Sequence, residues 1–182
     1  MATFNVNEFT SKFKGGGARP NLFKVRLSSL PNAVSERNGV NDFEFFCKSV
    51  SGIPASTIGA IEVPYFGRTI KFAGDREIGE LTTTIINEED MQVRNILDSW
   101  VNGLNGMINN RAGSSLGTRT EFTTSLSLHT YRKVGVEDQK WVFEKCWPSM
   151  VSSIDLNWDS TNTLQEYTVT WQYDTYKHDK AF

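Results

Sequence analysis

The segment from Gln165 to Tyr173 alternates between apolar and polar side chains. The apolar positions are Tyr167, Val169, Trp171 and Tyr173. The polar positions are Glu166, Thr168, Thr170 and Gln172. A period of two predicts a β-strand with one face on a hydrophobic core. The second face is long and polar, so it looks either onto open solvent or into a water-filled channel.

Similar strand signals recur along the chain, separated by clusters of Gly, Pro, Asn and Asp. The segments with alternating, aromatic or β-branched residues are 21–29, 43–50, 68–73, 80–87, 121–131 and 139–147. In the fifth of these, Phe122, Leu126 and Leu128 share one predicted face, and Thr123, Ser125, Ser127 and His129 share the other. The pattern predicts a mainly β protein, an antiparallel β-sandwich or split barrel.

One segment, about 87–104, has the period of a helix instead. Its apolar stripe consists of Val93, Ile96, Leu97, Trp100, Val101 and Leu104. Asn87 is a good N-cap, and Glu88, Glu89 and Asp90 would place negative charge at the positive helix end. We therefore expect one amphipathic helix that packs on a sheet.

The length of 182 residues indicates a single domain over 1–182. We expect a flexible N-terminal arm over 1–18 and a flexible tail over 175–182. Residues 102–120 form a long polar loop, and 51–67 are apolar for a surface loop. Asp75 and Arg76 are expected on a bend that ends a strand, where they could contact another subunit.

The charge balance disfavours a tight nucleic-acid binder, because 19 Lys and Arg face 21 Asp and Glu, for a net charge of -2. It is compatible with a protein that DNA merely passes. We see no secretory signal and no apolar run that would span a membrane, so folding in a cytoplasm is expected. Cys47 and Cys146 lie beside large aromatics and are expected as buried free thiols.

No catalytic or metal-binding motif stands out. His129 and His178 lack ligand spacing to each other or to Cys and carboxylates, and no GxSxG motif is present. We therefore expect no enzyme and no cofactor. Five tryptophans could indicate a sugar or small-ligand site. We expect core positions for Trp100, Trp141, Trp147 and Trp171, whereas Trp158 at a turn has no evident place.

The order of several segments resembles the tail tube proteins of contractile-tailed bacteriophages, from about residue 18 to 176. These segments are ARPNLFKVRL, FEFFCKSVSGIPAS, VPYFGRTIKFAGDRE, TTTIINEED, CWPSMVSSIDLNWDS and LQEYTVTWQYDTY. Two features depart from the family pattern. The loop near 31–42 looks longer than usual, and the tail after Thr175 is extended.

The resemblance implies a structural subunit that forms six-membered rings with a continuous inner β-barrel, a fold shared with the needle ring protein of type VI secretion. Stacked rings would make a hollow tube through which double-stranded DNA and the tape-measure protein pass. The implied partners are other copies of the chain, the tail sheath protein, a baseplate or tube initiator and a tail terminator. It implies no catalysis, no cofactor and no small-molecule ligand, and a location in the virion tail after assembly in the host bacterial cytoplasm.

Two sets of residues are candidates for these roles. The candidate lumen face comprises Thr123, Ser125, Ser127, Glu166, Thr168, Thr170 and Gln172. The candidate contacts between subunits or rings are Ile53, Pro54, Ile58, Ile61, Val63, Tyr65, Phe66, Asp75 and Arg76.

Alternatives stay open at this point. The tube could belong to a phage-tail-like bacteriocin or secretion particle, or the chain could be a tube initiator or baseplate ring protein. From another class, a monomeric ligand-binding β-sandwich would explain the aromatics but leaves the ordered segment match to chance.

Overall fold

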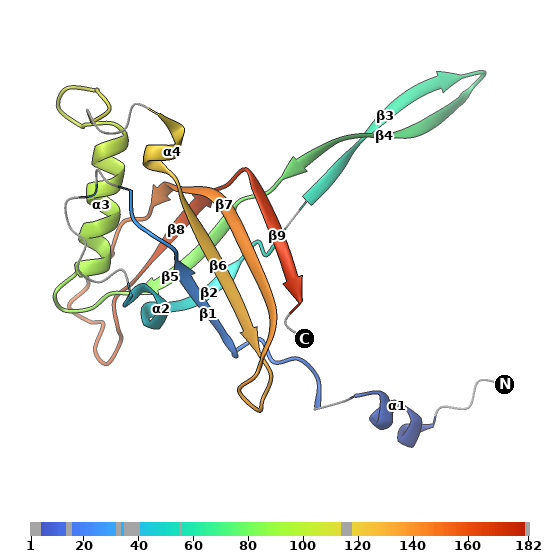
Figure 1. Cartoon of the computed structure of the whole chain (residues 1–182), viewed down its shortest axis with the longest axis horizontal. Helices are drawn as coiled ribbons and strands as arrows, with labels where there is room; N and C mark the ends of the chain where they lie inside the picture. Colours follow the sequence, from blue (N-terminus) through green and yellow to red (C-terminus); the bar gives the residue numbers. More distant parts are fainter. Residues whose placement is uncertain are drawn as a thin grey trace.

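The computed structural model describes residues 5–13, 16–31, 34, 41–54, 56–113 and 118–180. Within them the chain forms a seven-stranded antiparallel sheet, a separate two-stranded hairpin and four helices (Figure 1). The strands are β1 (Phe23–Leu27), β2 (Cys47–Ser51), β3 (Ser56–Tyr65), β4 (Arg68–Ile78), β5 (Leu81–Ile86), β6 (Thr124–Tyr131), β7 (Glu137–Val151), β8 (Glu166–Gln172) and β9 (Thr175–Lys180). The helices are α1 (Val6–Lys12), α2 (Phe43–Phe46), α3 (Gln92–Leu104) and α4 (Arg119–Phe122).

The long strand β7 divides the large sheet into two halves. Its first part pairs with β6 on one side and β9 on the other, and its last part pairs with β8. Close to the junction of these parts, Lys145 adopts a left-handed φ of 56°, which bends the strand. We call β1, β6, the first part of β7 and β9 the β6 half-sheet. The last part of β7 with β8, β5 and β2 is the β8 half-sheet. This arrangement confirms the predicted split barrel.

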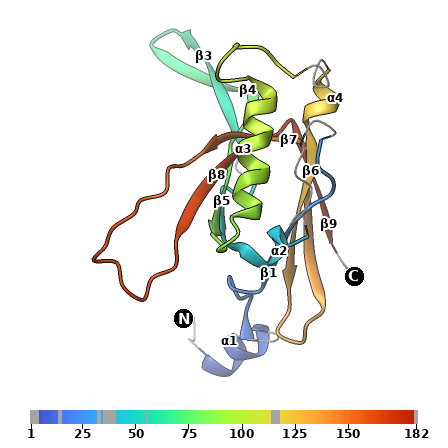
Figure 2. The same ribbon diagram turned by 90° about the vertical axis from the view of Figure 1, so that its left-hand side faces the viewer.

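A single hydrophobic core lies between the half-sheets, and α3 closes one opening between them (Figure 2). The apolar row of β8 is buried as predicted, with Trp171 completely inaccessible. Its ring lies 5.9 Å from that of Trp100 on α3, and its indole Nε1 donates to Thr83 Oγ1 at 2.9 Å. Trp141 and Trp147 are partly buried against the same core. The two half-sheets therefore point their other faces away from each other.

The helix begins later than predicted. Asn87 is not its N-cap, because the Asn87 N–H donates to the Gln165 carbonyl at 2.8 Å and extends the pairing of β5 with β8. Met91 takes the cap position with a left-handed φ of 49°. The expected negative charge at the helix end is present nonetheless, since the Glu88 carboxylate accepts the Val93 N–H at 3.3 Å.

Three other predicted segments differ from the structure. The run 43–50 begins as the short helix α2, which buries Phe43 and leaves Phe45 exposed before β2 starts at Cys47. The run 121–131 begins in α4, whose first turn has a capping box between Thr118 and Glu121. Thr123 follows that helix as its C-cap, so it is not part of β6.

The ends of the chain also carry more structure than expected. Thr175–Lys180, predicted as part of a flexible tail, forms β9 and pairs with β7. The stack of His178 on Trp141, with ring centroids 4.9 Å apart, helps to hold it there. Within the predicted N-terminal arm, α1 forms a helix without any buried residue. The remainder of the tail, residues 181–182, lies outside the described residues.

Candidate functional site

The outward face of the β8 half-sheet is lined by hydroxyl groups from three strands. Thr168 lies opposite Thr84, and Thr170 lies opposite Thr82. The same rows continue to β2 through Ser49 and Ser51. Cross-strand hydroxyl pairs of this kind stabilise a sheet while leaving it polar. The β8 row was predicted, but its partners on β5 and β2 were missed, although the alternation of Leu81, Thr83 and Ile85 with Thr82 and Thr84 was visible in the sequence.

Charge on this hydroxyl face is sparse and paired. Lys48 Nζ on β2 reaches across β5 to Glu166 Oε1 at 2.5 Å. At the other end of β8, the Gln172 side-chain amide donates to the Glu80 carboxylate. The face is therefore close to neutral, with no described Lys or Arg that lacks a carboxylate beside it.

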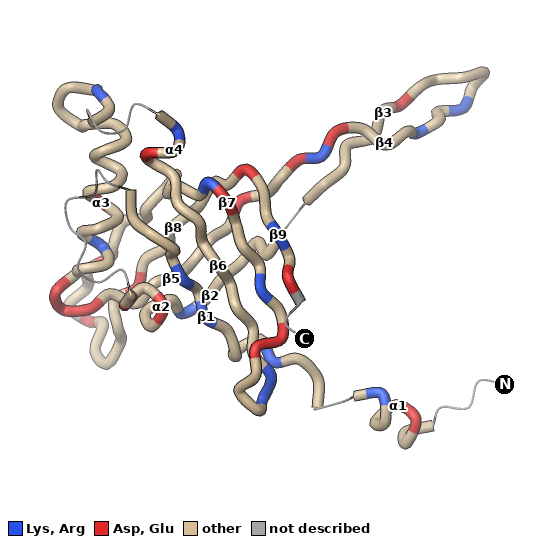
Figure 3. The backbone as a smooth tube through the Cα atoms, viewed as in Figure 1, with Lys and Arg blue, Asp and Glu red and all other residues tan. Residues whose placement is uncertain are grey.

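The outward face of the β6 half-sheet is different in kind, because it is strongly charged. Lys24 and Arg26 on β1 both bind the Glu44 carboxylate, at 2.5 Å each. Hydrogen bonds from Arg26 and then Lys24 lower the pKa of Glu44 to about 2. On the far side, Lys177 of β9 pairs with Glu144 of β7 at 2.6 Å. Figure 3 shows these charges on β1, β7 and β9, whereas β8 carries little charge along its length.

Ser127 and His129 on β6 form a buried network. His129 Nε2 lies 3.1 Å from Ser127 Oγ, and its Nδ1 lies 3.1 Å from Glu137 Oε1. Ser127 is 8% exposed and His129 is 6% exposed, so neither side chain faces open solvent in the monomer. The Ser127 hydroxyl also donates to the Arg26 carbonyl at 3.4 Å. The network therefore links β6 to β1, and the Ser127 side chain is part of the packing between these two strands.

The predicted lumen residues consequently do not form one surface. Glu166, Thr168, Thr170 and Gln172 lie on the outward face of the β8 half-sheet. Ser125 and Ser127 lie on the β6 half-sheet, on the opposite side of the core. One channel cannot be lined by both rows of the same subunit.

The predicted contact residues cluster on the projecting hairpin of β3 and β4 (Figure 1). The apolar stretch 51–67 is therefore mostly strand rather than loop. Ile58, Ile61, Val63, Tyr65 and Phe66 are all exposed, Phe66 at 91%. Ile53 and Pro54 lie between β2 and β3. A monomer rarely leaves so many large apolar side chains in water.

Asp75 and Arg76 do not form a corner, because both lie inside β4. The local irregularity is a shift in register between Ile58 and Ala60 on the facing strand. Gly59 and Gly74 face each other there, and a Cβ on Gly74 would approach the Gly59 carbonyl oxygen to 3.0 Å. The sequence "AGD" thus marks a position where the backbones of β3 and β4 approach closely.

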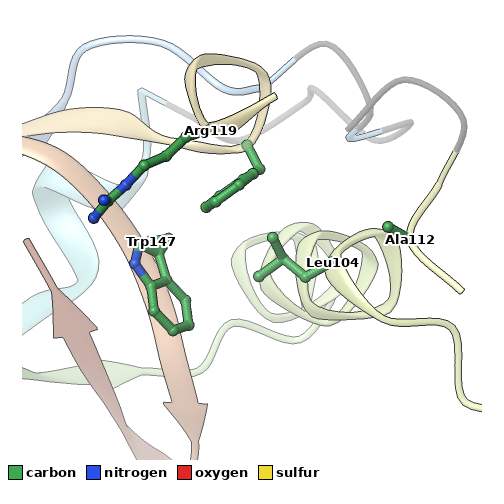
Figure 4. A pocket seen from close by; sticks show the side chains of 5 residues that line it. Leu104, Ala112, Arg119 and Trp147 are labelled. Carbon is green, nitrogen blue, oxygen red and sulfur yellow. The ribbon is translucent and has the colours of Figure 1, made fainter. Parts of the chain in front are cut away.

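A cavity of about 440 Å³ lies between the end of α3, α4 and β7 (Figure 4). Its lining residues are Leu104, Ala112, Arg119, Phe122 and Trp147. Among the described lining residues Arg119 is the single charged one, and it already binds the Asp174 carboxylate. A specific ligand site needs several convergent polar groups, which this lining does not offer.

Other chemistry finds little support in the described part of the chain. No group of His, Cys, Asp or Glu there has the arrangement of a metal site. None of the described helices is long and apolar enough to cross a membrane. Cys47 and Cys146 are buried free thiols, as predicted, and burial raises the pKa of each to about 12.

Comparisons with known proteins agree on one family. The family model described as phage tail tube protein matches residues 18–179. Tail tube protein gp19 of Enterobacteria phage T4 is 33% identical over 171 residues, which cover 93% of this chain and 97% of gp19. The tail tube protein of Serratia phage KSP90 is 25% identical over 174 residues, 95% of each chain. A solved sheath–tube complex of an extracellular contractile injection system, PVC, in the extended state shares the fold. It aligns with a TM-score of 0.61 and 14% identity over 98% of this chain and 100% of that one.

Proposed function

Because the chain belongs to the phage tail tube protein family and is a structural subunit of a virion tail, we propose that it forms hexameric rings that stack into a hollow conduit for DNA. In this proposal the conduit also admits the tape-measure protein. Ring closure would cover the sheet edges that the monomer leaves open. The subunit carries no chemistry of its own in this role.

The hydroxyl face of the β8 half-sheet lines the bore. The observation that carries this assignment is the contrast between the two outward faces. Each Lys or Arg that meets a phosphate strengthens DNA binding through counterion release, so a basic lining would hold DNA in place. The β6 half-sheet presents three cations, each paired with a carboxylate: Lys24, Arg26 and Lys177. The β8 half-sheet presents Thr and Ser hydroxyls and only the one pair of Lys48 with Glu166 among the described residues. The neutral face suits DNA that must slide.

The hairpin of β3 and β4 supplies contacts to neighbouring subunits. It follows β2 and precedes β5 directly, so it extends from the half-sheet that we assign to the bore. Its exposed apolar residues would be covered when it lies on another copy. Asp75, Arg76 and the N-terminal arm join this contact region.

The charged face of the β6 half-sheet then points outward, where a sheath would surround the tube. The PVC complex, which contains a sheath and a tube of this fold, supports such a partner. A baseplate or tube initiator at one end and a tail terminator at the other complete the proposed set. A tube initiator, or the tube of a bacteriocin-like particle, would present the same surfaces, and the genes beside this one would separate these roles.

Cysteine labelling tests the bore assignment. Thr170→Cys and Ser125→Cys place single thiols on the two opposite faces, and the native cysteines are buried. In the monomer both variants should react with a bulky maleimide–polyethylene glycol. In tubes verified by negative-stain electron microscopy, the thiol at 170 should be protected and the thiol at 125 should react. The reverse result would assign the β6 half-sheet to the bore.

A monomeric ligand-binding sandwich is the competing function. Trp100 and Trp171 are packed in the core, which removes them from any sugar site. If concentrated protein remains monomeric in sedimentation and electron microscopy at every salt concentration and pH, the tube proposal fails.

A further inference from the structure

The loop between β7 and β8, residues 152–165, presents three large apolar side chains to solvent. Leu156 is 83% exposed, Trp158 is 101% exposed and Leu164 is 71% exposed. A tryptophan is costly to leave in water, and it is among the residue types that most often dominate binding at interfaces. The proposed bore and hairpin contacts do not account for it.

The turn that carries Trp158 is held by backbone and side-chain hydrogen bonds. Asn157 Oδ1 accepts the Asp159 N–H at 3.0 Å, and the Asn157 carbonyl accepts the Ser160 N–H at 3.1 Å. Asx turns of this kind fix the path of a loop without a core beneath it. The indole is therefore displayed on a shaped turn.

This loop and the hairpin leave the β8 half-sheet at opposite ends. Leu81, which follows the hairpin, pairs with Trp171 near the end of β8. Ile86 pairs with Glu166, which follows the loop. Figure 1 shows the hairpin and the β7–β8 loop on opposite sides of the sheet. When the strands of this half-sheet line a bore, their two ends belong to the two opposite faces of a ring.

The hairpin tip matches the loop in chemistry. Tyr65 and Phe66 form an edge-on aromatic pair with centroids 4.7 Å apart. Phe66 has a φ of 43°, which an aromatic residue adopts only under strain, so the turn displays an aromatic at a conformational cost. Arg68 is the one charged residue of 64–70, and the loop carries Asp155 and Asp159 without any Lys or Arg. No ion pair among the described residues engages these three charges.

We propose that the β7–β8 loop, with Trp158 as its anchor, is the surface on which the hairpin tip of a copy in the next ring docks. Head-to-tail stacking brings one end of the half-sheet in each ring against the other end in its neighbour, so both apolar surfaces are covered at once. Arg68 then lies near the two Asp side chains and can stack on the Trp158 ring. This inference rests on the proposed tube.

Trp158→Ala tests the anchor, with Met150→Ala as the matched control. Met150 is also exposed, at 55%, but it lies on the same half-sheet within β7 rather than at the loop. We expect Trp158→Ala to form rings and to need about 30-fold more protein for tubes, the usual loss at an interface hot spot. Met150→Ala should form tubes at the wild-type concentration.

Tubes of Trp158→Ala at the wild-type concentration would overturn the inference and leave the proposed tube intact. Loss of rings as well as tubes would also overturn it, because the loop would then act within a ring. Wild-type protein that forms neither rings nor tubes would overturn the proposed function and this inference together.

A cross-link between copies gives an independent test. Phe66→Cys protein is mixed with Trp158→Cys protein under assembly conditions and treated with a thiol oxidant. We expect disulfide-linked dimers on a non-reducing gel from this mixture and none from Phe66→Cys mixed with Met150→Cys. Assembled tubes without the first cross-link, or with equal cross-linking in both mixtures, would contradict the docking.

Discussion

The ion pairs of Glu44 with Arg26 and Lys24 make the stability of the β1 edge depend on pH. The Glu44 side chain is 14% exposed, and Arg26 and Lys24 hold its pKa at about 2, below the ordinary value of 4.5. A carboxylate with a lowered pKa stabilises the fold above its unfolded pKa, and the stabilisation is lost as the pH falls from about 4.5 to 2. Because both partners are nearly half exposed, solvent screening leaves a contribution of about 1 kcal/mol.

We therefore expect Glu44→Gln to lower the free energy of unfolding by about 1 kcal/mol at pH 7, and by progressively less as the pH falls below about 4.5. Urea unfolding of wild type and Glu44→Gln at pH 7 and at several lower pH values measures this difference. Glu62→Gln is the control, because Glu62 and its partner Lys71 are both more than half exposed. A constant difference between wild type and Glu44→Gln across the acid range would contradict the assignment.

Thr82 and Thr83 are consecutive residues of β5, and their side chains lie on opposite faces of the strand. Thr83 is fully buried and accepts the hydrogen bond of the Trp171 indole. Thr83→Val leaves that N–H without a partner in the core, which costs about 1–3 kcal/mol. Thr82→Val changes only the outward face and should stay within about 0.5 kcal/mol. Equal losses in chemical denaturation would mean that the face assignment of β5 is wrong.

At the scale of elements, Lys145 is where β7 passes from one half-sheet to the other. Its left-handed φ is a conformation that glycine adopts freely and β-branched residues resist. We expect Lys145→Gly to leave stability unchanged or to raise it slightly, and Lys145→Val to lower it by about 1–2 kcal/mol. Lys140→Gly, at a regular position of the same strand, should be destabilising. A lower melting temperature for Lys145→Gly than for Lys145→Val would contradict a strained bend.

Alternation in the sequence was sufficient to predict the core faces of β6 and β8, because each of these strands packs one row of apolar side chains in the core. It failed where tertiary pairing decides. Asn87 looks like a helix cap but extends β5, since Gln165 is 78 residues away in sequence and adjacent in space. Thr175 begins a polar segment that reads as a tail and becomes β9 through pairing with β7. No Gly or Pro at position 145 indicates the bend in β7. The sequence could therefore not reveal that the two hydroxyl rows lie on opposite sides of the core.

At the scale of the whole molecule, the tube must let DNA move, and this depends on which face lines it. Thr170→Lys would add a ring of cations to the proposed bore, whereas Ser125→Lys would add the same charge to the opposite face. Tubes of Thr170→Lys should bind short DNA duplexes at low salt and protect them from nuclease. The protection should fall steeply between about 50 and 200 mM salt, because each phosphate contact adds to the salt dependence. Wild-type tubes and Ser125→Lys tubes should leave the same duplexes open to digestion. Protection by Ser125→Lys alone would place the β6 half-sheet in the bore, and protection by neither would mean that DNA does not enter the assembled tube.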